Sequence, residues 1–237
     1  MHFKDLIIDK KVVLVGPASY MVDSNFGEKI DSHDIVVRLN RGCELVEKYS
    51  KDIGTRTDVL YSSLIEQPEN AGKWDYSLFV EQFKIKYLCT TPAMSMKGIS
   101  NASILHPMVN KNKYYELSKH LPCRIVEHEF FTKIALEVDC RPTTGYISIF
   151  DILKHKPKLL SIYGFDFYLS GWLPEYKEGM KNITLEEIKI KTLKSKRHSH
   201  KNMWNHCKRL LDRKDVLLDE RMHDVLNLKN WWFDQGN

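Results

Sequence analysis

The sequence lacks the features that would place it in the membrane or in the secretory pathway. None of its apolar runs reaches 18 residues, which excludes a membrane-spanning helix. Its first residues carry charges at Asp9, Lys10 and Lys11, where a secretory signal peptide needs an apolar stretch. We therefore expect a cytoplasmic protein, with peripheral attachment at the inner surface of the membrane left open.

Cysteine pairs that could crosslink the chain or hold a metal are also lacking. The five cysteines are odd in number, widely spaced and without a Cys-x-x-Cys pair: Cys43, Cys89, Cys123, Cys140 and Cys207. This pattern predicts reduced thiols rather than a disulfide framework or a zinc site. With 43% hydrophobic and 28% charged residues, and without repeats or low-complexity linkers, the chain is expected to form one domain over residues 1–237.

Positive charge is present in excess and is concentrated near the C-terminus. The net charge is +5, and residues 189–214 hold ten Lys and Arg residues against a single acid, Asp212. Such a segment is either a solvated helix face or a surface for an anionic partner. A nucleic-acid-binding module is one alternative, with stacking aromatics at Trp204, Trp231 and Trp232.

Short apolar runs alternate with helix-like segments along the chain. The runs predict strands at residues 11–15, 34–38, 57–61, 84–89, 123–126 and 158–163. Helices are expected over residues 145–154, from Thr184 onward, and over residues 200–212. This alternation predicts an α/β fold: a single Rossmann-like domain with a mostly parallel sheet flanked by helices. Because ligands bind such sheets at the carboxyl ends of the strands, the residues after each strand are site candidates.

The first two strands are followed by small and polar residues. Gly16 permits a sharp turn and close approach to a ligand, and Ser19 offers a hydroxyl. Asn40, after the second strand, could hold a phosphate or a sugar hydroxyl, or serve only as a turn residue. The further glycines of a dinucleotide fingerprint are missing, which argues against that class of ligand.

Two later segments offer groups for an anion and a nucleoside. Thr143, Thr144 and Gly145 precede a predicted helix, where hydroxyls and backbone amides form an anion site. The last predicted strand is followed by Gly164, Phe165 and Asp166, and Trp172 comes six residues after Asp166. Asp166 could accept a hydrogen bond from a ribose or base and the aromatics could stack, unless the loop merely closes the core.

Two histidines lie in the basic segment, at His198 and His200. Imidazole suits a general base or a phosphate donor near neutral pH. Without a third ligand at a suggestive spacing, a metal role is disfavoured, and an exposed pair without function is the alternative.

Together these segments resemble glycosyltransferase family 29, the sialyltransferases. VVLVGPASYMVDSNFGEKIDSHDIVVRLNRG, at residues 12–42, resembles the large sialylmotif. RPTTGYISIFDILKHKPKLLSIYGFDFY, at residues 141–168, resembles the small sialylmotif, and GTRTD at residues 54–58 fits the stretch after the large motif. His200 followed by Asn205 resembles the very small motif, which is a histidine with a glutamate five residues on.

The resemblance implies a fold of the GT-A-like sialyltransferase type and a site for a CMP-activated acidic sugar. By position, Gly16, Ser19 and Asn40 would line the nucleotide and its phosphate. Residues 143–145 would hold the ribose and phosphate end of the cytidine, and Trp172 falls near an aromatic that packs on the nucleotide.

The chemistry that the resemblance implies is inverting and metal-independent, with no cofactor beyond the donor. His200 would be the base, and the sequence contains no Asp-x-Asp pair. The acceptor would be a glycan hydroxyl, with anionic and lipid-linked glycans both open.

Several positions depart from the family pattern. Pro17 stands where the family has asparagine, Asn205 replaces the glutamate, and Leu173-Pro174 replaces a histidine expected after Trp172. We therefore assign the missing phosphate donor to His198. The cysteines that link the two long motifs in secreted animal members are also absent, which suggests a compact bacterial or viral type. Its sugar could be sialic acid or Kdo, and an inactive family-29 fold is a further alternative.

Overall fold

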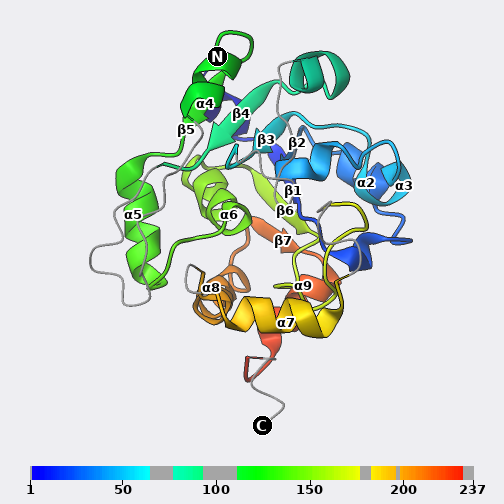
Figure 1. Cartoon of the computed structure of the whole chain (residues 1–237), viewed down its shortest axis with the longest axis vertical. Coiled ribbons are helices and arrows are strands. Elements are labelled where there is room, and N and C mark those ends of the chain that lie inside the picture. Colours follow the sequence, from blue (N-terminus) through cyan, green and yellow to red (C-terminus); the bar gives the residue numbers. More distant parts are fainter. Residues whose placement is uncertain (1, 65–76, 93–110, 177–182, 196–197, 232–237) are drawn as a thin grey trace.

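A central sheet with helices on both faces organises the molecule (Figure 1). The computed structural model describes residues 2–64, 77–92, 111–176, 183–195 and 198–231. The α/β, Rossmann-like prediction is confirmed, whereas the extent of the domain stays a prediction.

Seven strands form one sheet in the described part of the chain, and every pair of neighbours is parallel. In chain order they are β1 (Lys11–Val15), β2 (Ile35–Leu39), β3 (Val59–Tyr61), β4 (Tyr87–Thr90), β5 (Cys123–Ile125), β6 (Leu159–Tyr163) and β7 (Val216–Leu218). The six predicted strands are confirmed, with their ends shifted by up to three residues. The seventh was not predicted, because three apolar residues among charged ones give no clear period.

The order of the strands reverses beside β1. Across the sheet they run β5-β4-β3-β2-β1-β6-β7. The chain therefore moves outward from β1 to β5 and then returns to place β6 on the other side of β1. Such a reversal separates the connections at the carboxyl ends of β1 and β6, which is where open parallel sheets bind their ligands.

Each face of the sheet has its own cover. One face is covered by the short helices α2 (Gly27–Asp31) and α3 (Ser50–Ile53), and farther along by α4 (Lys111–Leu117). The larger core lies on the other face. It is covered by the helices α1 (Phe3–Ile7), α5 (His128–Glu137), α6 (Thr144–Lys154), α8 (His200–Cys207) and α9 (Glu220–Asn227). Alternate residues of β1 divide between the faces, Val12 and Leu14 to one and Val13 and Val15 to the other.

The predicted helices are present with small changes at their ends. Thr143 caps α6 by accepting the amide of Tyr146 at 3.2 Å. Helix α7 (Leu185–Leu193) begins with a capping box between Thr184 and Glu187. The last predicted helix is shorter than expected, because α8 ends at Cys207 and gives way to a 3₁₀ turn.

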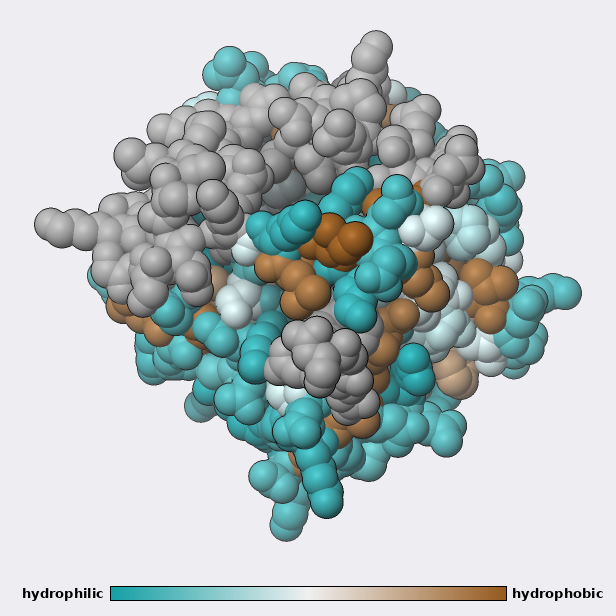
Figure 2. Space-filling model, turned by 60° about the horizontal axis from the view of Figure 1, so that its bottom comes forward, coloured by the Kyte–Doolittle hydropathy of each residue, from teal (hydrophilic) through white to brown (hydrophobic). Residues whose placement is uncertain are grey.

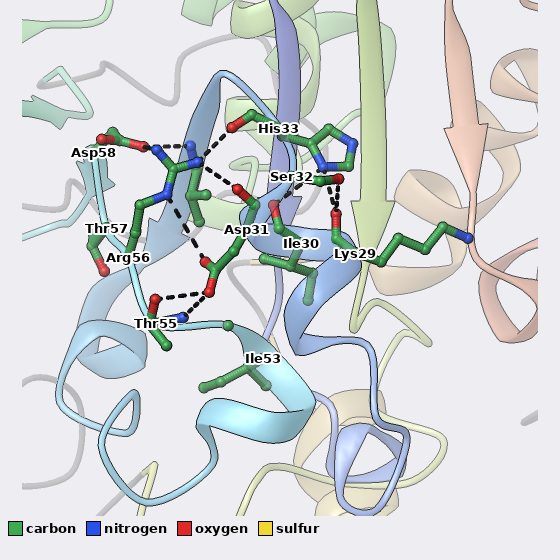
Figure 3. A network of polar contacts seen from close by, with 12 residues as sticks. Lys29, Ile30, Asp31, Ser32, His33, Ile53, Thr55, Arg56, Thr57 and Asp58 are labelled. Carbon is green, nitrogen blue, oxygen red and sulfur yellow. Dashed lines mark hydrogen bonds and ion pairs between the residues drawn. The ribbon is translucent and has the colours of Figure 1, made fainter.

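Much of the large sialylmotif forms a polar network at the amino ends of β2 and β3 (Figure 3). The Asp31 carboxylate accepts the amide and hydroxyl of Thr55, at 2.8 and 2.7 Å. Arg56 donates to the carbonyls of Asp31 and His33. Asp58 accepts the amide of Val36 at 2.8 Å, which ties the start of β3 to β2.

Two further residues complete what we call the motif network, defined as Asp31, His33, Arg38, Arg56 and Asp58. Arg38 is 1% exposed, and its guanidinium donates to the carbonyls of Ile53, Gly54 and Arg56 and to the Thr57 hydroxyl. The buried ring of His33 contacts the Ser161 hydroxyl at 2.8 Å, which ties it to β6. These residues therefore hold the loops before β2 and β3 and lie outside the carboxyl edge.

Candidate functional site

Two glycines meet where β1 and β6 end. The Gly16 amide donates to Tyr163 O at 2.7 Å, and the Ala18 amide donates to Gly164 O at 3.1 Å. A Cβ on Gly16 would lie 2.3 Å from Gly164 O, and Gly164 has φ +77°. Both positions therefore require glycine because the two backbones cross in contact.

The ring of Phe165 joins this crossing to the start of α6. A Cβ on Gly16 would lie 2.7 Å from the ring, and one on Gly145 would lie 3.0 Å from its Cε1 atom. Gly145 also packs against Leu39 of β2, because a Cβ added to Gly145 would lie 2.9 Å from the Leu39 Cδ1 atom. The ends of β1, β2 and β6 and the N-terminus of α6 thus surround one aromatic ring.

The loop after β6 pairs with the loop after β1. Ser19 donates its hydroxyl to Ser170 O, and its amide donates to Gly171 O at 3.3 Å. Ala18 and Trp172 form an antiparallel bridge. The predicted residues Ser19 and Trp172 are therefore neighbours, although their roles toward a nucleotide stay predictions.

Asn40 lies between the ends of β2 and β3 and the same loop. Its backbone has φ +42°, its amide group donates to the Tyr176 hydroxyl at 3.5 Å, and its side-chain oxygen accepts the Ser63 amide at 3.4 Å. Tyr176 in turn donates to Leu39 O at 3.3 Å. Burial raises the pKa of Tyr176, so this hydroxyl is a neutral donor at physiological pH.

The two predicted histidines reach this edge through aromatic contacts. His200 is buried at the first position of α8, and its ring meets Tyr168 edge-on at 5.0 Å between centroids. Tyr168 meets Trp172 at 5.2 Å, and His198 lies 6.1 Å from His200. We call Trp172, Tyr168, His200 and His198 the aromatic row.

The far end of the aromatic row reaches the segment before α6. His198 Nδ1 lies 2.7 Å from the carbonyl oxygen of Arg141. Because a carbonyl only accepts, this contact assigns the proton to Nδ1 and leaves Nε2 as the acceptor of a neutral ring. The row therefore runs from the loop after β6 to the residues that lead into Thr143, Thr144 and Gly145.

Thr143 and Thr144 begin α6 in the same neighbourhood. Thr143 uses its hydroxyl as the N-cap, and Thr144 is half-buried at the first helical position. Upstream, Arg141 donates to Thr91 after β4 at 3.4 Å. An N-terminus with such hydroxyls and unpaired helix amides favours an anion.

Asp166 stabilises the loop after β6. It is 1% exposed, and its carboxylate accepts the Ser170 amide at 2.7 Å. Burial raises its pKa. Asp166 therefore holds the turn that carries Tyr168 and Trp172, and a contact with a ribose or base stays a prediction.

Sequence reasoning missed a tyrosine–carboxylate pair beneath the glycine crossing. The Tyr20 hydroxyl donates to Asp219 at 2.5 Å and accepts the amides of Gly164 and Phe165, at 2.9 and 3.1 Å. Asp219 also caps α9. Burial, with the nearby Asp219 charge, raises the pKa of Tyr20. Because the two partners are 199 positions apart in the sequence, no local pattern could reveal this pair.

Two of the three aromatics proposed for the nucleic-acid alternative are not available for stacking. Trp204 and Trp231 are buried, and the Trp204 ring nitrogen donates to Val225 O at 2.8 Å. They therefore pack in the core and cannot stack on bases, which corrects that interpretation. Lys196, Arg197 and Trp232 lie outside the described residues.

Two kinds of feature are absent from the described residues. Nowhere in them do three or more His, Cys, Asp or Glu side chains gather in a way that could hold a metal ion. None of their helices has the length and apolar character needed to cross a membrane.

The sequence model of glycosyltransferase family 29 (sialyltransferase) matches residues 9–214, which include the glycine crossing, the start of α6 and the aromatic row. The chain belongs to glycosyltransferase family 29. It is therefore a glycosyltransferase of the sialyltransferase type, and the family implies a CMP-sugar donor.

Solved structures support the fold of this family-29 enzyme. A mammalian sialyltransferase in complex with Gal-beta-1-3GalNAc-ortho-nitrophenol has 19% identity and a TM-score of 0.55, over 91% of this chain and 71% of its own. A further mammalian sialyltransferase crystal structure has 20% identity and a TM-score of 0.54, over 88% of this chain and 68% of its own. Comparison with curated protein sequences gives no significant match.

Proposed function

We propose that this family-29 enzyme transfers an acidic sugar, sialic acid or a Kdo-like sugar, from CMP to a glycan hydroxyl with inversion and without a metal ion. One observation carries the proposal. The aromatic row brings both histidines to the edge where the ends of β1 and β6 and the N-terminus of α6 meet. This arrangement supports a donor site and a proton acceptor at the same edge of the sheet.

The donor would lie across the glycine crossing. Gly16 and Gly164 leave no side chain there, and Ser19 and Asn40 flank the position. The single phosphate of CMP would lie at the N-terminus of α6, where amides and the Thr144 hydroxyl complement its charge.

The reaction needs one proton acceptor and one stabilised leaving group. In the proposed step, the acceptor hydroxyl attacks the anomeric carbon from the face opposite the phosphate and gives its proton to His200. The bond to CMP breaks, and the electron pair leaves with the phosphate. His198 in its protonated form would donate from Nε2 to that phosphate, while Nδ1 stays bonded to Arg141 O.

Metal independence is supported by the charge of the leaving group. CMP leaves with one phosphate, so less negative charge develops than on a nucleoside diphosphate. Helix amides, hydroxyls and an imidazolium suit that smaller charge. The sequence also contains no Asp-x-Asp pair.

Thermal unfolding with CMP tests the donor site. CMP at a hundred times its dissociation constant should stabilise the enzyme by about 2.7 kcal/mol, a clearly visible shift in Tm. NAD at the same concentration is the control and should shift Tm little. A shift with NAD and none with millimolar CMP would contradict the proposal.

Turnover assays separate the remaining alternatives. CMP-sialic acid and CMP-Kdo are compared as donors, with and without a chelator. Transfer that persists in EDTA supports the metal-free mechanism, and loss of transfer that manganese restores would overturn it. Binding of CMP without turnover of either donor would instead indicate an inactive family-29 fold.

A further inference from the structure

Helix α7 exposes an unusual amount of apolar side chain. Among the described residues seven large apolar side chains are exposed, and three of them lie on this nine-residue helix: Leu185 (56%), Ile190 (41%) and Leu193 (54%). Ile190 and Leu193 are three residues apart and share one side of the helix. Since α7 turns Ile188, and in part Leu185, toward the protein, its outer face carries Ile190 and Leu193 without a described partner in the fold.

Lysines surround these apolar side chains. Lys191 and Lys194 are exposed, and Lys194 lies one turn after Ile190. The two acids of the helix, Glu186 and Glu187, are in its first turn, where Glu187 serves the capping box. The second half of α7 is therefore both apolar and positively charged. Figure 2, in which the bottom of Figure 1 comes forward, shows hydrophobic residues interspersed with hydrophilic ones.

The inner side of α7 contacts the site. A Cβ on Gly171 would lie 3.2 Å from Ile188 and 3.3 Å from Leu185. Gly171 belongs to the loop that carries Tyr168 and Trp172 of the aromatic row. Figure 1 shows α7 across the lower end of the molecule, opposite α4. Whatever binds the outer face of α7 therefore lies close to the proposed transfer site.

We propose that the outer face of α7 docks on an anionic lipid bilayer and that the enzyme takes its glycan acceptor from that surface. Interfacial helices combine exposed leucines and isoleucines with lysines that attract acidic headgroups, as α7 does. A nucleic acid would need the charge but not the apolar side chains, and α7 carries no aromatic residue for stacking. The acceptor part of the proposal rests on the proposed function, because it assumes transfer at the aromatic row.

Vesicle sedimentation tests the docking surface directly. The full chain is mixed with phosphatidylcholine vesicles, either pure or containing about one third phosphatidylglycerol. Binding is expected to the anionic vesicles and to be weak on the neutral ones. The double variant Lys191→Gln/Lys194→Gln should lower the affinity about 25-fold, at roughly fivefold per lysine. Its control, Lys119→Gln/Lys158→Gln, removes the same charge from exposed positions elsewhere and should stay within about twofold of wild type.

A second pair of variants tests the apolar contribution. Ile190→Ser/Leu193→Ser should weaken binding to anionic vesicles by about tenfold, since less apolar surface can enter the interface. Leu217→Ser changes a comparably exposed side chain on β7 and should leave binding unchanged. Equal binding of the two serine variants would contradict docking through α7.

The outcomes also separate this inference from the proposed function. All variants should keep the wild-type Tm shift with CMP, because none of them lies in the aromatic row. A normal CMP shift without vesicle binding overturns the docking surface alone. Vesicle binding without a CMP shift overturns the donor site and leaves the surface. The lipid proposal is overturned if wild type shows no preference for anionic vesicles but binds an oligonucleotide that Lys191→Gln/Lys194→Gln does not bind. That result would assign α7 to nucleic acid.

Discussion

The two ends of the sheet hold polar residues in different ways. In the motif network, at the amino ends of β2 and β3, Arg38 is buried and its guanidinium donates to four oxygens of the loop before β3. At the carboxyl edge, Ser19, Asn40 and His198 are half-buried, and each contacts a loop far away in the sequence. The large sialylmotif contributes residues to both ends.

The difference separates residues that build the fold from those available for chemistry. A buried charge is tolerated only when its hydrogen bonds are complete, so changes in the motif network should lower stability. Half-buried groups at a loop-lined edge contribute less to stability and can exchange their partners for a ligand. Changes there should lower turnover while the fold persists. The following experiments test that division.

The largest effect is expected for His200→Ala. Removing the proposed base should lower turnover by roughly 10²–10⁴-fold, while the CMP affinity stays close to wild type, because a general base acts in the transition state. Turnover is measured on a verified donor and acceptor, and CMP affinity by calorimetry. His223→Ala is the matched control, since His223 lies on the exposed face of α9.

The neighbouring histidine has a different expected signature. His198→Ala should lower both turnover and CMP affinity, the latter by roughly 10- to 100-fold, because a hydrogen bond to a charged group contributes about 1.5–3 kcal/mol. If the two signatures are exchanged, His198 is the base and His200 the donor. Wild-type turnover in both variants would place the base elsewhere and remove the aromatic row from the mechanism.

At the other end of the sheet, Arg38→Met should act on stability. The buried carbonyls of Ile53, Gly54 and Arg56 lose their donor, and we expect the free energy of unfolding to fall by about 3–5 kcal/mol. CMP should bind the remaining folded protein within a few-fold of wild type. Urea unfolding and calorimetry measure the two quantities.

A surface arginine provides the control for this change. Arg213 is exposed and pairs only locally, with Asp215 at 2.6 Å. Arg213→Met should therefore cost less than about 1 kcal/mol. A stable Arg38→Met variant with greatly weakened CMP binding would show that the motif network is part of the donor site.

How much the sequence reveals also differs between the two ends. The strands of the sheet are predictable, because runs such as residues 11–15 are short, apolar and β-branched. The residues at the carboxyl edge follow from the general rule that parallel sheets bind ligands there. The resemblance to family 29 then assigns Gly16, Asn40 and Thr143 to one predicted nucleotide-sugar site.

The contacts that shape the site are not predictable from the same patterns. Tyr20 and Asp219, or Asn40 and Tyr176, meet only because the loops after β1, β2 and β6 fold onto one another. Tyr168 ends the segment that resembles the small sialylmotif, but that resemblance does not indicate that it connects Trp172 to His200. Local spacing has no information on such long-range contacts.

The smallest effect is a pH dependence of stability at the amino end of the sheet, where α6 ends in His155. Its ring packs edge-on against Phe3 at 5.1 Å and lies 3.8 Å from Asp151. Burial, reinforced by Arg124 and Lys154 and opposed by Glu127, lowers the pKa of His155 to about 4. Burial raises the pKa of Asp151 to about 6, in spite of the Arg124 charge.

The sign of the effect follows from these directions. A histidine with a depressed pKa stabilises the fold above its ordinary pKa of about 6.5, and this stability is lost as the pH falls toward 4. Asp151 acts in the opposite sense below pH 6, so the wild-type curve alone does not isolate either group. Between pH 7 and pH 4.5, the free energy of unfolding of His155→Gln should therefore fall by about 2 kcal/mol less than that of wild type.

Urea unfolding at a series of pH values measures this difference, with His223→Gln as the exposed control. Parallel curves for wild type and His155→Gln would show that His155 is not held neutral by its surroundings. Turnover of His155→Gln at pH 7 should match wild type, because this histidine lies at the opposite end of α6 from Thr144. If His155→Gln instead lost turnover with its stability unchanged, residues at the amino end of the sheet would also take part in the chemistry. The division between a stabilising end and a catalytic end would then not hold along α6.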